Sequence, residues 1–133
     1  MIDIENYVFD TVYRAIIKEY PTINILSRAD GQVGKFPAVY LSETDNAVAR
    51  KYQTQRLEDD YVDILYECQV FSNKEKNARA ETKHIMTLIN NAMVEMGFVR
   101  LSNRPLQNVM DTTITRRVAR WRATTDGKTI YRG

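Results

Sequence analysis

An alternating segment that leads directly into an amphipathic helix is the feature that most constrains the fold of this chain. Between 61 and 71, apolar residues occupy every second position, while Asp63, Glu67 and Gln69 lie between them. Side chains on a strand point alternately to its two faces, so this pattern predicts a strand with one face in the core. The core-facing set is Val62, Ile64, Tyr66, Cys68 and Val70.

The helix that follows is predicted over 74–96. Ser72 or Asn73 is placed to cap it, and Glu75 falls in the first turn, where a negative charge suits the helix dipole. Gly97 occupies the position where a left-handed residue ends a helix. Its apolar residues form a stripe of roughly 140°, which must lie on the sheet. They are Ala78, Ile85, Leu88, Ile89, Ala92, Met93 and Met96.

A first helix is predicted over 3–20, with Pro21 marking its end. Its apolar residues recur at three- and four-residue steps, and Phe9, Tyr13 and Ile17 widen the apolar arc to roughly 220°. One sheet cannot cover so wide an arc. Either a loop of the same chain or a neighbouring subunit covers the rest. The width favours the neighbour and makes Phe9, Tyr13 and Ile17 candidate subunit-interface residues.

The segment between the first helix and the central strand predicts a hairpin followed by a polar arm. Short apolar runs at 22–27 and 36–41 flank the turn signal Asp30-Gly31. The range 42–60 is polar and lacks a sustained apolar pattern. Such a connection is either a mobile loop or an arm used by partners.

The C-terminal third predicts a short strand at 98–101, an irregular stretch at 102–108 and a strand at 109–123. The apolar alternation of that last strand slips between Val118 and Trp121, which a bulge or bend would explain. Asp126-Gly127 then predicts a turn returning 128–132 alongside 116–123.

Together these segments predict one α+β domain over residues 1–133. We expect a mixed, mainly antiparallel sheet of four to six strands, flanked by the two main helices.

Composition excludes several classes of protein. With 44% hydrophobic and 27% charged residues, the chain of 133 residues suits one ordinary folded domain. A net charge of +2 is too small for a dedicated nucleic-acid binder. No apolar run approaches the roughly 18 residues of a membrane span, so no membrane partner is expected. A single cysteine and the absence of a signal-like N-terminus favour synthesis in the cytoplasm.

The residues that can carry chemistry give no catalytic or cofactor site. His84, the only histidine, lies outside the helical stripe without further metal ligands, and Cys68 alternates with core residues as a buried thiol. The acidic run Glu58, Asp59 and Asp60 is read as a solvated turn or a salt-bridging patch, rather than a cation site. No glycine-rich phosphate loop is present. We therefore expect a protein that is not an enzyme and needs no metal or cofactor.

Four arginines make the strongest local charge feature: Arg116, Arg117, Arg120 and Arg122. On one interpretation, which the pattern favours, they form the solvated face of the sheet and pair with Asp63 and Glu67. On the other, some of them meet an acidic surface of another subunit, such as the Glu58–Asp60 run.

Four short segments carry a resemblance to a known family. They are Phe-Pro-Ala-Val-Tyr at 36–40, Tyr-Glu-Cys-Gln-Val-Phe-Ser-Asn-Lys at 66–74, Met-Gly-Phe at 96–98 and Arg-Arg-Val-Ala-Arg-Trp at 116–121. In their order and spacing, the chain resembles the tail terminator proteins of long-tailed bacteriophages.

That resemblance implies a structural virion protein, made in the host cytoplasm. Such a protein forms a hexameric ring on the head-proximal end of the tail tube, stops tube growth and docks the head connector. Its partners would be copies of itself, the tail tube protein and the connector or neck proteins, with DNA only as passing cargo. The subunit contacts would map to the 42–60 arm and the arginine strand.

Other functions stay open at this point. Head–tail adaptors, tube-like subunits and minor capsid proteins share this size and architecture, although two helices over nearly a third of the chain favour a terminator over a tube subunit. A small DNA-binding module would use Arg116 to Arg122. A small enzyme on a ferredoxin-like fold would need a convergent set of titratable groups, which the sequence lacks.

Overall fold

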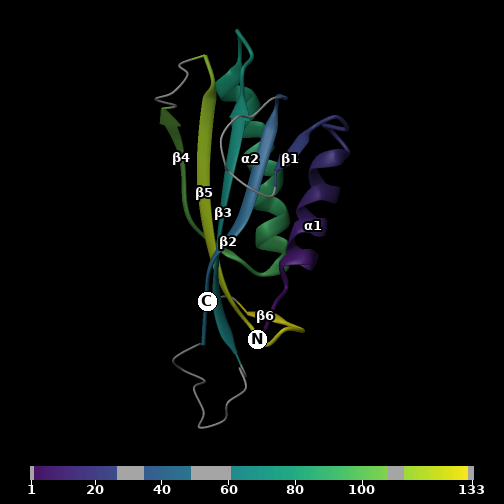
Figure 1. Ribbon diagram of the computed structural model, residues 1–133, viewed down its shortest axis with the longest axis vertical. Helices are drawn as coiled ribbons and strands as arrows, with labels where there is room; N and C mark the ends of the chain where they lie inside the picture. The colour runs from purple at the N-terminus through teal and green to yellow at the C-terminus, as the bar shows by residue number, and fades with distance from the viewer. Residues whose placement is uncertain (1, 27–34, 49–60, 108–112, 132–133) are drawn as a thin grey trace.

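The computed structural model describes residues 2–26, 35–48, 61–107 and 113–131. The described residues form a six-stranded sheet in the order β1-β2-β3-β5-β4, with β6 also paired to β5. Both helices lie on the same side of this sheet (Figure 1). The elements are α1 Glu5–Ile17, β1 Asn24–Leu26, β2 Ala38–Val48, β3 Val62–Ser72, α2 Ala78–Met96, β4 Val99–Gln107, β5 Thr115–Thr125 and β6 Ile130–Tyr131. The predicted α+β class is confirmed.

The alternating segment is the central strand of the sheet. β3 pairs antiparallel with β2 on one side and with β5 on the other, in unbroken register with β5 from Val62 opposite Thr125 to Ser72 opposite Thr115. All five predicted core-facing residues of β3 are buried. The period-two pattern therefore located both the strand and its inner face, the face turned toward the helices.

The core lies between this inner face and α2. Ile85, Ile89 and Met93 of α2 are fully buried. Trp121 of β5 is also fully buried, and its indole N–H donates to Asn90 Oδ1 at 3.0 Å. The predicted helical stripe is correct at its centre, because these side chains must leave water together with the sheet.

The start of α2 differs from the prediction. The helix begins at Ala78 rather than at 74, and its N-cap is Asn77 in a left-handed conformation (φ 65°), without a side-chain capping bond. Glu81, not Glu75, is the acidic residue of the first turn. Ser72 Oγ donates to Glu81 Oε1 at 2.8 Å, and Lys74 Nζ lies 2.7 Å from Glu81 Oε2. Residues 73–77 thus form a connection, tied down by the buried Glu81.

The end of α2 agrees with the prediction. Gly97 has φ 112°, and its N–H donates to the carbonyl of Val94 at 3.0 Å. A Cβ at this position would come within 2.9 Å of the Ile130 carbonyl oxygen in β6. Glycine is needed here both for its backbone conformation and for its size.

The first helix is shorter than the predicted range 3–20. Val8, Val12 and Ile16 of α1 are buried, and Phe9 packs against the core from a partly buried position. Tyr7 and Tyr13 keep 55% and 41% of their surface exposed. The chain itself thus covers part of the wide apolar arc, and the aromatic flank stays open.

The N-terminal strands correct two predictions. β1 and β2 pair in parallel, with Asn24 opposite Ala38, so they do not form a hairpin. β2 continues to Val48, so the first part of the predicted polar arm is a strand. Its polar residues escaped recognition because an edge strand tolerates polar side chains on both faces. The range 49–60 and the Asp30-Gly31 turn lie outside the described residues.

β4 and β5 bring three further corrections. β4 runs through the stretch predicted to be irregular, because an edge strand can accommodate Pro105. β5 spans 115–125 rather than 109–123, and its register with β3 shows no bulge. The irregularity lies in β4, between Arg100 and Ser102. β5 appeared to slip because Val118 is buried on the outer face, the side away from the helices, whereas Trp121 is buried on the inner face.

The C-terminal turn forms where it was predicted, but β6 is short. It pairs with Thr124 and Thr125 rather than with 116–123, because β4 already occupies that part of the β5 edge. No described helix is long and apolar enough to cross a membrane.

Candidate functional site

The four predicted arginines of β5 divide between the two faces of the sheet. The register places Arg116, Arg120 and Arg122 on the outer face and Arg117 on the inner face. Arg120 Nε donates to Glu67 Oε1 at 3.0 Å while the arginine side chain stays 53% exposed. The predicted cross-strand pair with Glu67 is therefore confirmed.

The remaining arginine predictions have mixed outcomes. Asp63 accepts a hydrogen bond from Thr124 Oγ1 at 2.6 Å, and its predicted pairing with an arginine stays a prediction. Arg117 Nη1 donates to Asn103 Oδ1 at 3.2 Å. Burial, and then the charge of Arg79 on α2, lower the pKa of Arg117. Arg117 is thus held between sheet and helix and does not belong to an outer arginine patch.

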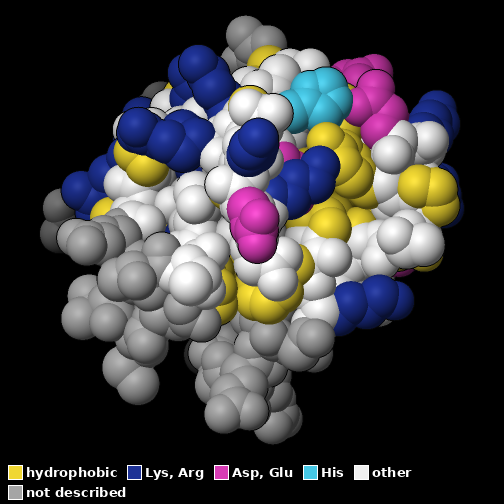
Figure 2. Space-filling view, turned by 90° about the horizontal axis from the view of Figure 1, so that it is seen from above, with side chains coloured by type: hydrophobic (Ala, Val, Ile, Leu, Met, Phe, Trp, Pro, Cys, Tyr) yellow, Lys and Arg dark blue, Asp and Glu magenta, His cyan; other side chains and the backbone are white. Residues whose placement is uncertain are grey.

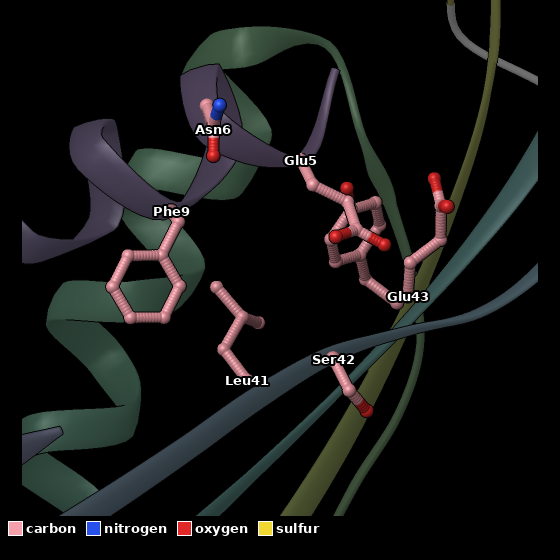
Figure 3. Close-up of a pocket in the computed structure, with 7 residues that line it drawn as sticks. Glu5, Asn6, Phe9, Leu41, Ser42 and Glu43 are labelled. Carbon is pink, nitrogen blue, oxygen red and sulfur yellow. The ribbon is translucent and has the colours of Figure 1, made fainter. Parts of the chain in front are cut away.

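A pocket of about 370 Å³ opens between the start of α1 and β2 (Figure 3). Phe9 and Leu41 lie opposite each other in it, Glu5 reaches from α1 toward β2, and Ser42 points away from the helix. This combines an apolar wall with carboxylates in one recess. Its lining is Glu5, Asn6, Phe9, Leu41, Ser42, Glu43 and Tyr66.

Two polar atoms in this pocket lack a partner. Tyr66 is only 2% exposed, and its hydroxyl is buried without a hydrogen bond to any described residue. Glu43 Oε1 is likewise buried and unbonded within the described part of the chain. A buried polar atom that lacks a hydrogen bond costs about 1–3 kcal/mol. The free protein therefore carries a donor and an acceptor that a ligand could satisfy.

The pocket also has a negative electrostatic potential. Burial raises the pKa of Tyr66, and the nearby carboxylates of Glu43, Glu5 and Asp3 raise it further. Burial likewise raises the pKa of the Glu43 carboxyl, which Asn46 lowers and the charges of Glu5 and Asp3 raise. Asp3 Oδ1 is fixed by the backbone N–H of Glu5 at 2.9 Å. Clustered acids beside apolar carbon suit a cation with an aliphatic stem.

The pocket adjoins an open edge of the sheet. On the side of β2 away from β3, β1 covers β2 only as far as Tyr40, and no described strand pairs there from Leu41 to Val48. β4 forms the opposite edge, where Arg100 and Arg104 are exposed and Leu101 keeps 48% of its surface open. One edge is thus acidic and the other basic.

Sequence reasoning found Phe9 but missed Glu5, Glu43 and Tyr66 as pocket residues. A signal for Glu43 was present, since it continues the alternation of Val39 and Leu41 on the inner face. It was missed because the strand was ended at 41. Of the predicted interface residues, Tyr13 and Ile17 lie on α1 outside the pocket. Glu58, Asp59 and Asp60 lie outside the described residues.

The other singled-out residues have ordinary surroundings. Cys68 is fully buried, and burial raises the pKa of its thiol. His84 is exposed, and its Nε2 lies 2.5 Å from Glu19 Oε2. Seen from the end of the molecule, the histidine adjoins acidic side chains, and several separate groups of Lys and Arg side chains lie on the described part of the same face (Figure 2). In the described ranges, no group of His, Cys, Asp or Glu is arranged to hold a metal.

No protein-family model matches this chain, and no curated protein matches it in sequence.

Proposed function

We propose that this protein is a tail terminator: a structural virion protein that closes into a ring, hexameric as the sequence resemblance implies, on the end of a phage tail tube. One observation carries the proposal, namely that the two edges left unpaired by the described strands, β2 from Leu41 to Val48 and β4, have opposite charge. Glu43 lies on the β2 edge, with Glu5 beside it, and Arg100 lies on the β4 edge.

A closed ring needs a heterologous contact, in which two different patches of each subunit meet. Opposed edges of opposite charge provide two such patches, and each copy then offers its β4 edge to the β2 edge of the next. The same arrangement discourages edge-on pairing of like edges, since like charges would face each other.

The outer face of the sheet and the exposed aromatic flank of α1 remain for other partners. In the proposed particle these are the tail tube protein on one side of the ring and the head connector or neck proteins on the other. Tyr7 and Tyr13 supply the kind of amphipathic aromatic surface that is enriched in protein–protein contacts.

The deciding experiment measures the mass and shape of the particles that the protein forms. Purified protein is examined by light scattering and negative-stain microscopy, alone and after mixing with isolated tail tubes. We expect ring-sized particles that cap one end of a tube. A species that stays monomeric at high concentration and in the presence of tubes would contradict the proposal. Rings that do not bind tubes but bind connectors would indicate another neck component instead.

A DNA-binding module is the outcome to separate from ring assembly. Its signature is binding of duplex DNA that weakens steeply as salt rises. Because Arg120 is already paired with Glu67 and Arg117 with Asn103, we expect no such binding.

A further inference from the structure

We propose that the pocket between α1 and β2 receives the Arg100 side chain of a second copy of this chain, so that each subunit supplies a socket at one sheet edge and a plug at the other. This inference rests on the proposed ring and names the contact that would hold it together.

The socket lacks a hydrogen-bond donor and a positive charge, and an arginine provides both. Glu43 Oε1 needs a donor, and Glu5 places a second carboxylate in the same recess. A guanidinium has five N–H donors in a planar fork that pairs with carboxylates, and it is weakly hydrated. The Tyr66 hydroxyl is both donor and acceptor, so it can accept one of the remaining N–H groups. Phe9 and Leu41 would cover the aliphatic stem.

Register selects Arg100 as the plug. Glu43 pairs with Tyr66, Tyr66 with Trp121 and Trp121 with Arg100, so the two charged residues lie at opposite ends of one cross-strand row. The Arg100 side chain is exposed and makes no hydrogen bond or ion pair to another described residue. A copy placed beside the first, with this row continued, would bring its Arg100 against Glu43.

Strand direction is compatible with this placement. Three antiparallel pairings separate β2 from β4, so the two edge strands run in opposite directions. Placing β4 of one copy beside β2 of the next therefore makes an antiparallel contact, with the helices of both copies on the same side.

The other arginines fit less well. The row that ends at Arg104 passes through Val118, Gln69 and Tyr40 to Leu26 of β1, so its far end is covered. Arg120 is engaged by Glu67 on the outer face. Among the described strands, β1 thus leaves only the 41–48 section of β2 unpaired on the side away from β3, and that section adjoins the pocket.

The first test is a directed disulfide. Ser42 and Leu101 adjoin the proposed Glu43–Arg100 contact, and replacing them leaves both charges in place. Cys68, the single cysteine, is fully buried, so a Ser42→Cys, Leu101→Cys variant has two reactive thiols. Within one chain these positions are three strand spacings apart, about 14 Å, beyond the roughly 7 Å limit between Cα atoms for a disulfide. Mild oxidation should therefore yield a ladder of cross-linked oligomers ending at the ring size. A Glu75→Cys, Leu101→Cys control, with its first thiol on the exposed 73–77 connection, should give little cross-linking.

The second test is charge reversal, read out by light scattering. Glu43→Arg and Arg100→Glu should each weaken self-association at least tenfold, and the combined variant should recover most of it. The control Glu75→Arg with Lys83→Glu changes two exposed charges elsewhere and should leave self-association unchanged. Thermal melts of all variants check that the subunit still folds.

The outcomes separate this contact from the ring itself. If the wild-type protein forms rings, the charge-reversal variants form them equally well and the cysteine variant gives no cross-linked ladder, the Arg100 socket is overturned and the ring proposal stands. A wild-type protein that never self-associates, with or without tail tubes, would overturn both.

Discussion

Glu43 and Arg100 occupy the two ends of one row of residues that crosses the sheet through Tyr66 and Trp121. The aromatic residues between them are buried, so the row is hydrophobic at its centre and oppositely charged at its ends. In the proposed ring, the Arg100 end of this row in one copy meets the Glu43 end of the row in the next copy.

Removing the unpartnered hydroxyl of Tyr66 should separate folding from assembly. The Tyr66 hydroxyl has no hydrogen bond in the geometry of the described residues, so in Tyr66→Phe we expect the unfolding free energy to stay equal or to rise by up to about 1 kcal/mol. Self-association should weaken several-fold. Urea unfolding and light scattering measure the two effects, with the exposed Tyr7→Phe as control. A clear loss of subunit stability would show that the hydroxyl is already bonded in the free protein.

Protonation of Glu43 should have opposite effects on the stability of the isolated subunit and on self-association. Its pKa in the folded subunit is raised above 4.5, so between the two values the folded state holds more protons than the unfolded state. The contribution of Glu43 to subunit stability therefore falls as pH rises through this window. Association with an arginine needs the ionised carboxylate, so it should strengthen over the same range.

The Glu43→Gln variant tests this pH dependence. At neutral pH it should stabilise the isolated subunit by less than about 1 kcal/mol, because water partly screens the site. The charges of Glu5 and Asp3 help to raise the pKa of Glu43 above 4.5. The variant should therefore also remove most of the pH dependence of association above pH 4.5. Urea unfolding and sedimentation at several pH values measure both. An association profile identical to wild type would place the relevant carboxylate elsewhere.

Gly97→Ala should destabilise the subunit by about 1–3 kcal/mol, because it combines a strained positive φ with close contact. The added Cβ would meet the Ile130 carbonyl oxygen at 2.9 Å, in the strand that closes the C-terminal turn. Thermal unfolding measures the loss. Gly127→Ala is the matched control, since it also has positive φ but meets only the Ile2 side chain, at 3.4 Å. Equal losses in the two variants would show that conformation alone is responsible.

Arg120→Glu should disturb assembly more than folding. The arginine is half exposed, and its pair with Glu67 contributes less than about 1 kcal/mol. The reversed charge would face Glu67 on the outer surface of the sheet and should lower subunit stability only slightly. Because Arg120 lies on the outer face, which is left for the tail tube or connector, chemical unfolding and counting of capped tail tubes by microscopy compare the two effects. A loss of stability as large as the loss of capped tubes would identify Arg120 as a structural residue.

Much of the fold was predictable from residues with a strong period. The alternation of β3, the stripe of α2 and the glycine that ends it each follow from local physical constraints. The strand and the glycine are correct, and the stripe is correct at its centre, although it omitted the buried Met86. Edge strands were the weak point. β2 beyond Leu41 and β4 beyond Leu101 carry polar residues because little packs on them, so they have no hydrophobic period to detect.

The candidate site was less predictable, because it depends on pairing across the sheet. Nothing local to Glu43 indicates that Glu5 and Tyr66 lie beside it, since α1 and β3 are far away in sequence. The division of Arg116 and Arg117 between two faces follows from alternation and was available from the start. The ring contacts assigned to Phe9, Tyr13, Ile17 and the β5 arginines remain predictions.

Because α1 and α2 cover the same side of the sheet, the subunit is polarised before it meets any neighbour (Figure 1). Rotation about a common axis preserves that polarity, so the outer face of every sheet would have the same orientation relative to the ring axis. A single substitution such as Arg120→Glu then changes the charge on one whole face of the assembly, whereas a change at Tyr13 leaves that face unchanged.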